Sequence, residues 1–102
     1  MDERSTRSFL QKMQQLSEEH EQLQTEIVTL EDVIADDEVG LSLLQGEKRN
    51  TFLDLRDSYL RRIGSNRRRL ALLQEEETTN RLMHQQLELK LSEIQGRLQA
   101  AE

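Results

Sequence analysis

Apolar side chains recur along this chain at alternating spacings of four and three residues, which is the repeat of an α-helical coiled coil. The repeat runs from Phe9 to Leu41 and returns from Ile63 to Ala101. The 102 residues include no proline, so no residue forces either stretch to end. The sequence therefore predicts an all-α fold in which long helices pair as an elongated coiled coil.

The two heptad stretches are out of phase by one residue. An 11-residue spacing over residues 41–63 reconciles them, as in a coiled coil that is locally straighter. This spacing favours one long continuous helix. The alternative is a helical hairpin that turns near residues 46–50, with Gly46 closing the first helix and Asn50 or Thr51 capping the second. The residues leave both alternatives open.

Four segments follow from the spacing and the charge of the side chains. Residues 1–8 form a polar N-terminal tail, residues 9–41 an acidic heptad coiled coil, residues 41–69 a basic segment, and residues 63–102 a C-terminal heptad coiled coil. The chain has two phenylalanines, one tyrosine and no tryptophan. Because a short chain with so few aromatic side chains builds a weak core, we expect self-association or a partner.

The apolar residues of the repeat are predicted to form the oligomer interface. These residues, here called the apolar stripe, are Phe9, Met13, Leu16, Leu23, Ile27, Leu30, Ile34, Leu41, Leu44, Phe52, Leu55, Tyr59, Ile63, Leu70, Leu73, Leu87, Leu91, Ile94 and Leu98. Polar residues within such a stripe lower stability and fix register or oligomer number. Four are predicted to have this role: His20, Asn66, Asn80 and His84. Asp37, Lys48 and Glu77 also interrupt the stripe.

Further leucines lie outside the stripe at spacings of ten and seven residues. They are Leu43, Leu53, Leu60, Leu72, Leu82 and Leu89. A wide apolar face indicates burial on two sides, as in a bundle of three or four helices. The alternative is that these are scattered surface leucines, which are common in soluble proteins.

Charge is divided unevenly along the chain. Residues 1–47 carry 3 basic and 12 acidic side chains, whereas residues 48–69 carry 8 basic and 2 acidic ones. A parallel dimer would set the basic block beside its own copy, so antiparallel pairing is favoured. Within a hairpin the expected partners are Glu31, Asp32, Asp36 and Asp37 on one side and Arg56, Arg61 and Arg62 on the other.

The basic block also suggests a strip for an acidic partner. Its arginines are Arg49, Arg56, Arg61, Arg62, Arg67, Arg68 and Arg69. A guanidinium group engages two phosphate or carboxylate oxygens at once, which suits nucleic acid or an acidic cytoskeletal filament. Nucleic acid is disfavoured, because the pI is about 5.0 and the neighbouring aromatic residues Phe52 and Tyr59 belong to the stripe.

Several classes of function lack any supporting motif. The chain has no cysteine, and its two histidines lack metal-ligand spacing, so no metal is expected. There is no glycine-rich phosphate loop or nucleophile motif, so we expect neither a cofactor nor an enzyme. The longest apolar run, residues 70–73, is too short for a membrane span, and residues 1–7 lack the apolar region of a secretory signal. The cytoplasm is the expected location, with the nucleus as the alternative.

These features together predict a structural coiled-coil module for protein–protein interaction. It would act as an oligomerising scaffold or tether in a larger assembly, pairing with itself as a dimer or tetramer, with other coiled-coil subunits, or with both. The alternative is an adaptor that binds an acidic polymer through the arginine strip.

Overall fold

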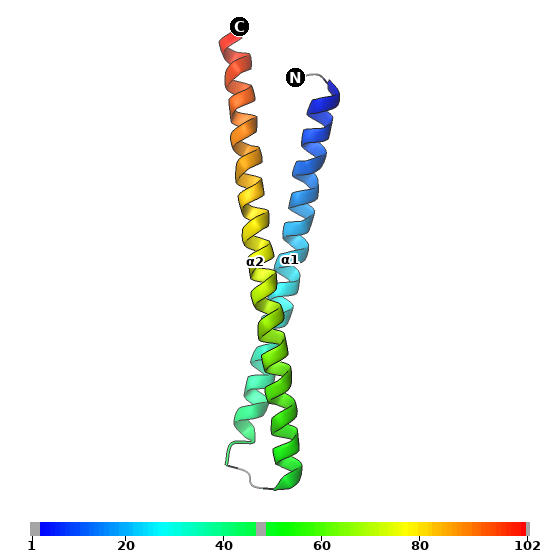
Figure 1. The fold of residues 1–102 in the computed structure, drawn as a ribbon, viewed down its shortest axis with the longest axis vertical. Helices are drawn as coiled ribbons and strands as arrows, with labels where there is room; N and C mark the ends of the chain where they lie inside the picture. The colour runs from blue at the N-terminus through cyan, green and yellow to red at the C-terminus, as the bar shows by residue number, and fades with distance from the viewer. Residues whose placement is uncertain (1–2, 47–48, 102) are drawn as a thin grey trace. The chain divides into compact units, whose positions relative to one another are not determined.

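The computed structural model describes residues 3–46 and 49–101. Helix α1 spans Glu3–Leu43 and helix α2 spans Asn50–Ala101 (Figure 1), and the described ranges contain no strand. The predicted all-α fold is confirmed, and of the two arrangements the structure adopts the hairpin. Since α1 begins at Glu3, most of the predicted polar tail is helical.

A tight turn ends α1. The N–H groups of Leu44 and Gln45 donate to carbonyl oxygens three residues earlier, at 3.1 and 3.2 Å. Hydrogen bonds of this 3₁₀ type tighten the last turn of a helix. Gly46 follows with a φ of 86°, a left-handed conformation that costs a residue with a Cβ about 1–2 kcal/mol. The continuous helix is therefore wrong, and the conformation of Gly46 agrees with its predicted place at the end of the first helix.

Helix α2 begins at Asn50, so its cap residue lies before both predicted caps. The N–H of Leu53 donates to the carbonyl of Arg49 at 3.0 Å, and this is the first helical hydrogen bond of α2. Arg49 therefore occupies the cap position, and Asn50 and Thr51 are the first helical residues. The prediction that one of them caps the helix is wrong, because the backbone bond fixes the boundary whichever side chains follow.

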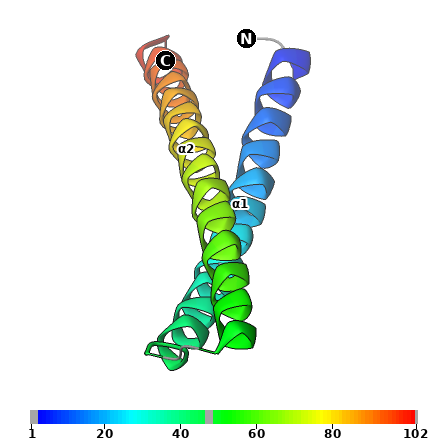
Figure 2. The same cartoon turned by 60° about the horizontal axis from the view of Figure 1, so that its bottom comes forward.

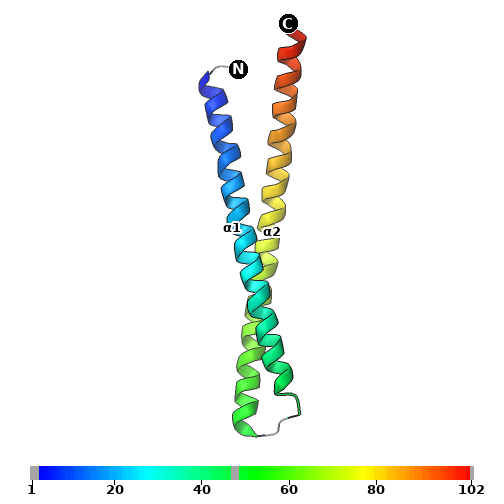
Figure 3. The same ribbon diagram turned by 180° about the vertical axis from the view of Figure 1, so that it is seen from behind.

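The two helices divide into two compact units, and each unit takes a part of both helices. The turn unit is Gln24–Glu75, and the terminal unit is Met1–Leu23 with Glu76–Glu102. Within the turn unit the end of α1 lies beside the start of α2 with opposite direction (Figures 2 and 3). In the terminal unit the start of α1 pairs with the end of α2, so antiparallel pairing occurs within the chain.

Burial in each unit is confined to the face that one helix turns toward the other. Two helices enclose only the side chains between them, because every other side of each helix faces solvent. The buried apolar side chains are Leu16 in the terminal unit and Ile27, Ile34, Leu44, Ile63 and Leu73 in the turn unit.

Candidate interaction surfaces

The apolar stripe lies between the helices of the chain itself. Besides the buried residues named above, its half-buried members are Phe9, Met13, Leu23, Leu30, Leu41, Phe52, Tyr59, Leu70, Leu87, Leu91 and Ile94. Only Leu55 and Leu98 are exposed, at 42% and 62%. Leu55 belongs to the 11-residue spacing, which applies to a continuous helix. An oligomer interface made by these residues stays a prediction, and a surface for a second chain has to include side chains that the hairpin leaves exposed.

Three arginines of the basic block pair with carboxylates of α1 in the turn unit. Arg62 contacts Asp37 Oδ1 at 3.1 Å, Arg69 contacts Glu26 at 3.5 Å, and Arg67 forms an ion pair with Glu38. In the terminal unit, Arg7 lies 3.9 Å from Glu3 of the same helix. The pair Arg62–Asp37 was among the predicted partners. The other predicted partners, Glu31, Asp32, Asp36, Arg56 and Arg61, make no ion pair with a described residue.

The direction of each side chain explains these differences. Arg61 lies two residues before the buried Ile63, which turns it about 200° from the helix contact. Asp32 stands in the same relation to the buried Ile34. Charge spacing along the sequence therefore selected the right pair of blocks, and helical phase selected which members meet.

A cluster around Tyr59 brings the helices of the turn unit close together. The guanidinium carbon of Arg62 lies 4.9 Å from the centre of the Tyr59 ring, within cation–π range. The same Arg62 contacts Asp37, whose other oxygen, Oδ2, is buried without a hydrogen bond. A Cβ placed on Gly40 would come within 2.7–2.9 Å of the Tyr59 ring and hydroxyl, so the absence of a side chain at Gly40 makes room for Tyr59. The spacing of the apolar residues carries no signal for this contact, because the contact depends on the register between the two helices.

The polar residues of the stripe occupy different depths. Asn80 is 3% exposed, and its Nδ2 donates to the carbonyl of Leu16 at 3.0 Å while its Oδ1 is buried without a partner. His20, Asn66 and His84 are half-buried, and Lys48 lies outside the described residues. His20, Asn80 and His84 line one open hollow of about 380 Å³ in the terminal unit.

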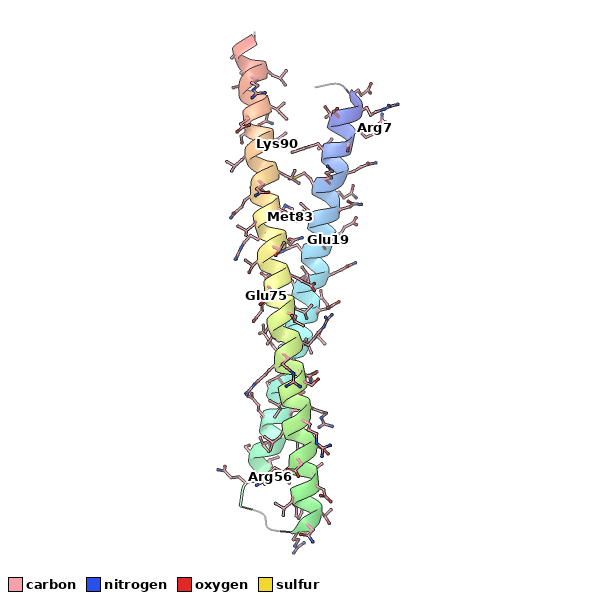
Figure 4. The ribbon with its side chains drawn as sticks, viewed as in Figure 1. Arg7, Glu19, Arg56, Glu75, Met83 and Lys90 are labelled. Atoms are coloured by element: carbon pink, nitrogen blue, oxygen red, sulfur yellow. The ribbon has the colours of Figure 1, made fainter. Side chains whose placement is uncertain are left out.

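A second hollow lies beside the turn. It has a volume of about 430 Å³, and Leu41 and Leu60 supply its apolar lining, with Glu38, Ser42 and Arg56 around them. Figure 4 shows Arg56 on the first turns of α2, beside the end of α1. A third hollow, in the terminal unit, includes Met83, Glu19 and Lys90, which Figure 4 also labels.

Five of the six leucines outside the stripe are exposed. Leu43, Leu60, Leu72, Leu82 and Leu89 are between 48% and 77% exposed, and Leu53 is half-buried. Their spacing in the sequence had already set them apart from the stripe. Within the basic block, four arginines make no ion pair with a described residue: Arg49, Arg56, Arg61 and Arg68.

Comparison of the chain with family models, with curated proteins and with solved structures finds no match. Over residues 3–46 and 49–101, neither helix contains an apolar stretch that could span a membrane. The same ranges hold no group of three or more histidine, cysteine, aspartate or glutamate side chains placed to bind a metal ion.

Proposed function

We propose that this chain is a structural protein–protein interaction module that self-associates as a scaffold or tether. The observation that carries the proposal is the number of large apolar side chains that the hairpin leaves in solvent, Leu43, Leu60, Leu72, Leu82 and Leu89 among them. Burial of apolar surface is worth about 25 cal/mol per Å², so covering these leucines with further helices would stabilise the chain. A helical bundle of two hairpins is the simplest arrangement that covers them.

The weakness of the hairpin core supports the same proposal. Few apolar side chains are buried, and two of the buried side chains, Asp37 and Asn80, each have an oxygen without a hydrogen-bond partner. Such an atom costs about 1–3 kcal/mol. Small domains with limited cores commonly gain their stability from oligomerisation.

Multi-angle light scattering with sedimentation equilibrium tests the proposal at micromolar concentrations. The expected result is a discrete dimer or tetramer with high helicity by circular dichroism. A fully helical monomer at all concentrations would contradict self-association. Low helicity of the isolated chain would indicate instead that a different subunit supplies the missing helices.

A second candidate function is an adaptor for an acidic polymer, and the exposed arginines favour it. Arg49, Arg56, Arg61 and Arg68 make no ion pair with a described residue. This candidate is weaker, because Arg62, Arg67 and Arg69 are engaged by α1. It predicts salt-dependent retention on heparin at low ionic strength that is lost on changing Arg61 and Arg68 to glutamate. A chain that passes through heparin unretained would exclude the adaptor.

A further inference from the structure

One face of the turn unit combines apolar side chains with charges of both signs. Glu38 of α1 and Arg56 and Leu60 of α2 line the same hollow, and the ion pair with Glu38 places Arg67 on this side as well. Residues seven positions apart lie on one side of a helix, which adds Glu31 before Glu38 and Leu53 before Leu60. We call Glu31, Glu38, Leu53, Arg56, Leu60 and Arg67 the turn face.

On this face the sign of the charge depends on the helix. Its acidic side chains, Glu31 and Glu38, belong to α1, and its basic side chains, Arg56 and Arg67, belong to α2. Leu60 lies among them and is 48% exposed, and it borders the hollow next to the turn. A surface with this arrangement is complementary to itself if α1 of one copy meets α2 of another.

We infer that the turn face is the site where a second copy of this chain docks, with its turn at the same end, to form a four-helix bundle. The inference rests on the proposed self-association and names the surface and the geometry. A closed dimer has a twofold axis, and the same patch of both copies then forms the contact. Two directions of this axis bring the turn faces together, and the charges distinguish them.

An axis parallel to the helices places α1 of one copy over α2 of the other, in opposite directions. With this axis each residue keeps its height above the turn. Asp37 faces Arg62 and Gly40 faces Tyr59 within the chain, and these two pairs give the scale by which residues of α1 and α2 are matched in height. On this scale Glu31 lies level with Arg67 of the second copy. Arginine has five N–H donors, so Arg67 can hold Glu38 of its own chain and also Glu31 of the other.

An axis perpendicular to the helices would instead place α1 over α1. Glu31 and Glu38 would then oppose the same carboxylates of the second copy, and Arg56 and Arg67 would oppose arginines. Like charges opposed across an interface are unfavourable, so the charges disfavour a dimer with the perpendicular axis. The parallel axis also covers Leu53 and Leu60 with α1 of the second copy, which removes exposed apolar surface.

Disulfide trapping tests the geometry, because the natural chain has no cysteine. On the scale above, Ser42 of one copy lies level with Arg56 of the other, and both line the hollow. We would mix the separately purified variants Ser42→Cys and Arg56→Cys under mild oxidation. The matched control mixes Val39→Cys with Arg61→Cys, which are at a similar height but point away from the turn face.

The expected result is a covalent heterodimer as the main product of the first mixture and only random cross-linking in the control. Replacing Leu60 by alanine should raise the dissociation constant of the dimer about tenfold, as truncating a contact side chain does. Leu72→Ala is the matched control, since Leu72 is similarly exposed on the same helix, at 53% against 48% for Leu60, but is turned about 120° away.

The outcomes separate this inference from the proposed function. A dimer by light scattering with equal cross-linking in both mixtures, or with equal effects of the two leucine variants, would overturn the turn face while leaving self-association intact. A chain that is monomeric at all concentrations would overturn both.

Discussion

At the scale of single residues, Gly40 and Tyr59 set how closely the two helices of the turn unit approach. A glycine inside a helix costs about 1 kcal/mol relative to alanine. The structure gives a reason for this cost at Gly40, because the Tyr59 ring occupies the space that a Cβ would need. The ring in turn carries Arg62, which reaches Asp37.

We predict that Gly40→Ala lowers the free energy of unfolding by about 1–2 kcal/mol, despite the better helix propensity of alanine. The Tyr59 ring has to move away, and its contact with Arg62 is lost. Urea unfolding followed by circular dichroism measures the change. The control is Gly64→Ala, where the nearest atom is 3.9 Å away, and it should stabilise the chain by up to about 1 kcal/mol.

A double-mutant cycle connects the effect to the tyrosine. In a Tyr59→Ala background the space above Gly40 is open, so Gly40→Ala should become stabilising, as Gly64→Ala is. If Gly40→Ala changes the free energy of unfolding equally with and without the Tyr59 ring, the contact with Tyr59 is not the reason for a glycine at position 40.

Asn80 is the polar stripe residue with the clearest structural role. Its Nδ2 donates to the Leu16 carbonyl, which fixes the register between α1 and α2 in the terminal unit, but its Oδ1 has no hydrogen-bond partner. We predict that Asn80→Leu raises the free energy of unfolding by about 1–2 kcal/mol, because an unpaired buried oxygen is removed. It should also broaden the distribution of oligomers, because a register constraint is lost.

Urea unfolding and sedimentation velocity measure the two effects of Asn80→Leu separately. The half-buried Asn66 provides the comparison, and Asn66→Leu should change the oligomer distribution less. A destabilised Asn80→Leu chain would show that the unpaired oxygen has a partner in solution.

Much of the residue-scale pattern could be predicted from the sequence. The spacing alone located the stripe positions, including the fully covered Leu73, because helical phase and burial are linked. It could not pair Gly40 with Tyr59, since that contact depends on the register between two helices. It also did not predict that Leu55 stays exposed in the hairpin, because the 11-residue spacing assumed a continuous helix.

At the scale of elements, the turn decides that the chain forms a hairpin. The sequence left a continuous helix open because each glycine near the turn costs a helix only about 1 kcal/mol, less than packing can contribute. Helix α1 ends at Leu43 because pairing α1 with α2 buries the stripe within one chain. Local propensity therefore could not choose between the two arrangements, and tertiary packing did.

We predict that Gly46→Ala lowers the free energy of unfolding by about 1–2 kcal/mol, because its φ of 86° is strained for any residue with a Cβ. No atom lies within 4 Å of the added Cβ, so the cost is one of backbone conformation alone. Gly46→Asn should recover part of the loss, since asparagine tolerates this conformation better than alanine. Thermal unfolding of the three chains gives the order, and equal midpoints would contradict the strain.

At the scale of the whole molecule, the acidic and basic blocks favour antiparallel over parallel pairing of the helices. The acidic first part and the basic central block meet in the turn unit through Arg62, Arg67 and Arg69. Exposed ion pairs contribute only about 0–1 kcal/mol each, so they select the direction of pairing and leave most of the stability to apolar burial. The sequence predicted the antiparallel direction for this reason.

Because the hairpin core is small, its stability should depend on protein concentration. We predict that the thermal unfolding midpoint rises as the concentration is increased, since a dimer that forms only from folded chains stabilises them by mass action. Differential scanning calorimetry over a hundredfold range of concentration measures it, and Leu60→Ala should flatten the dependence by weakening the dimer. Leu72→Ala should preserve it. A midpoint that does not change with concentration would mean that the hairpin is stable alone, and that its exposed leucines are ordinary surface residues.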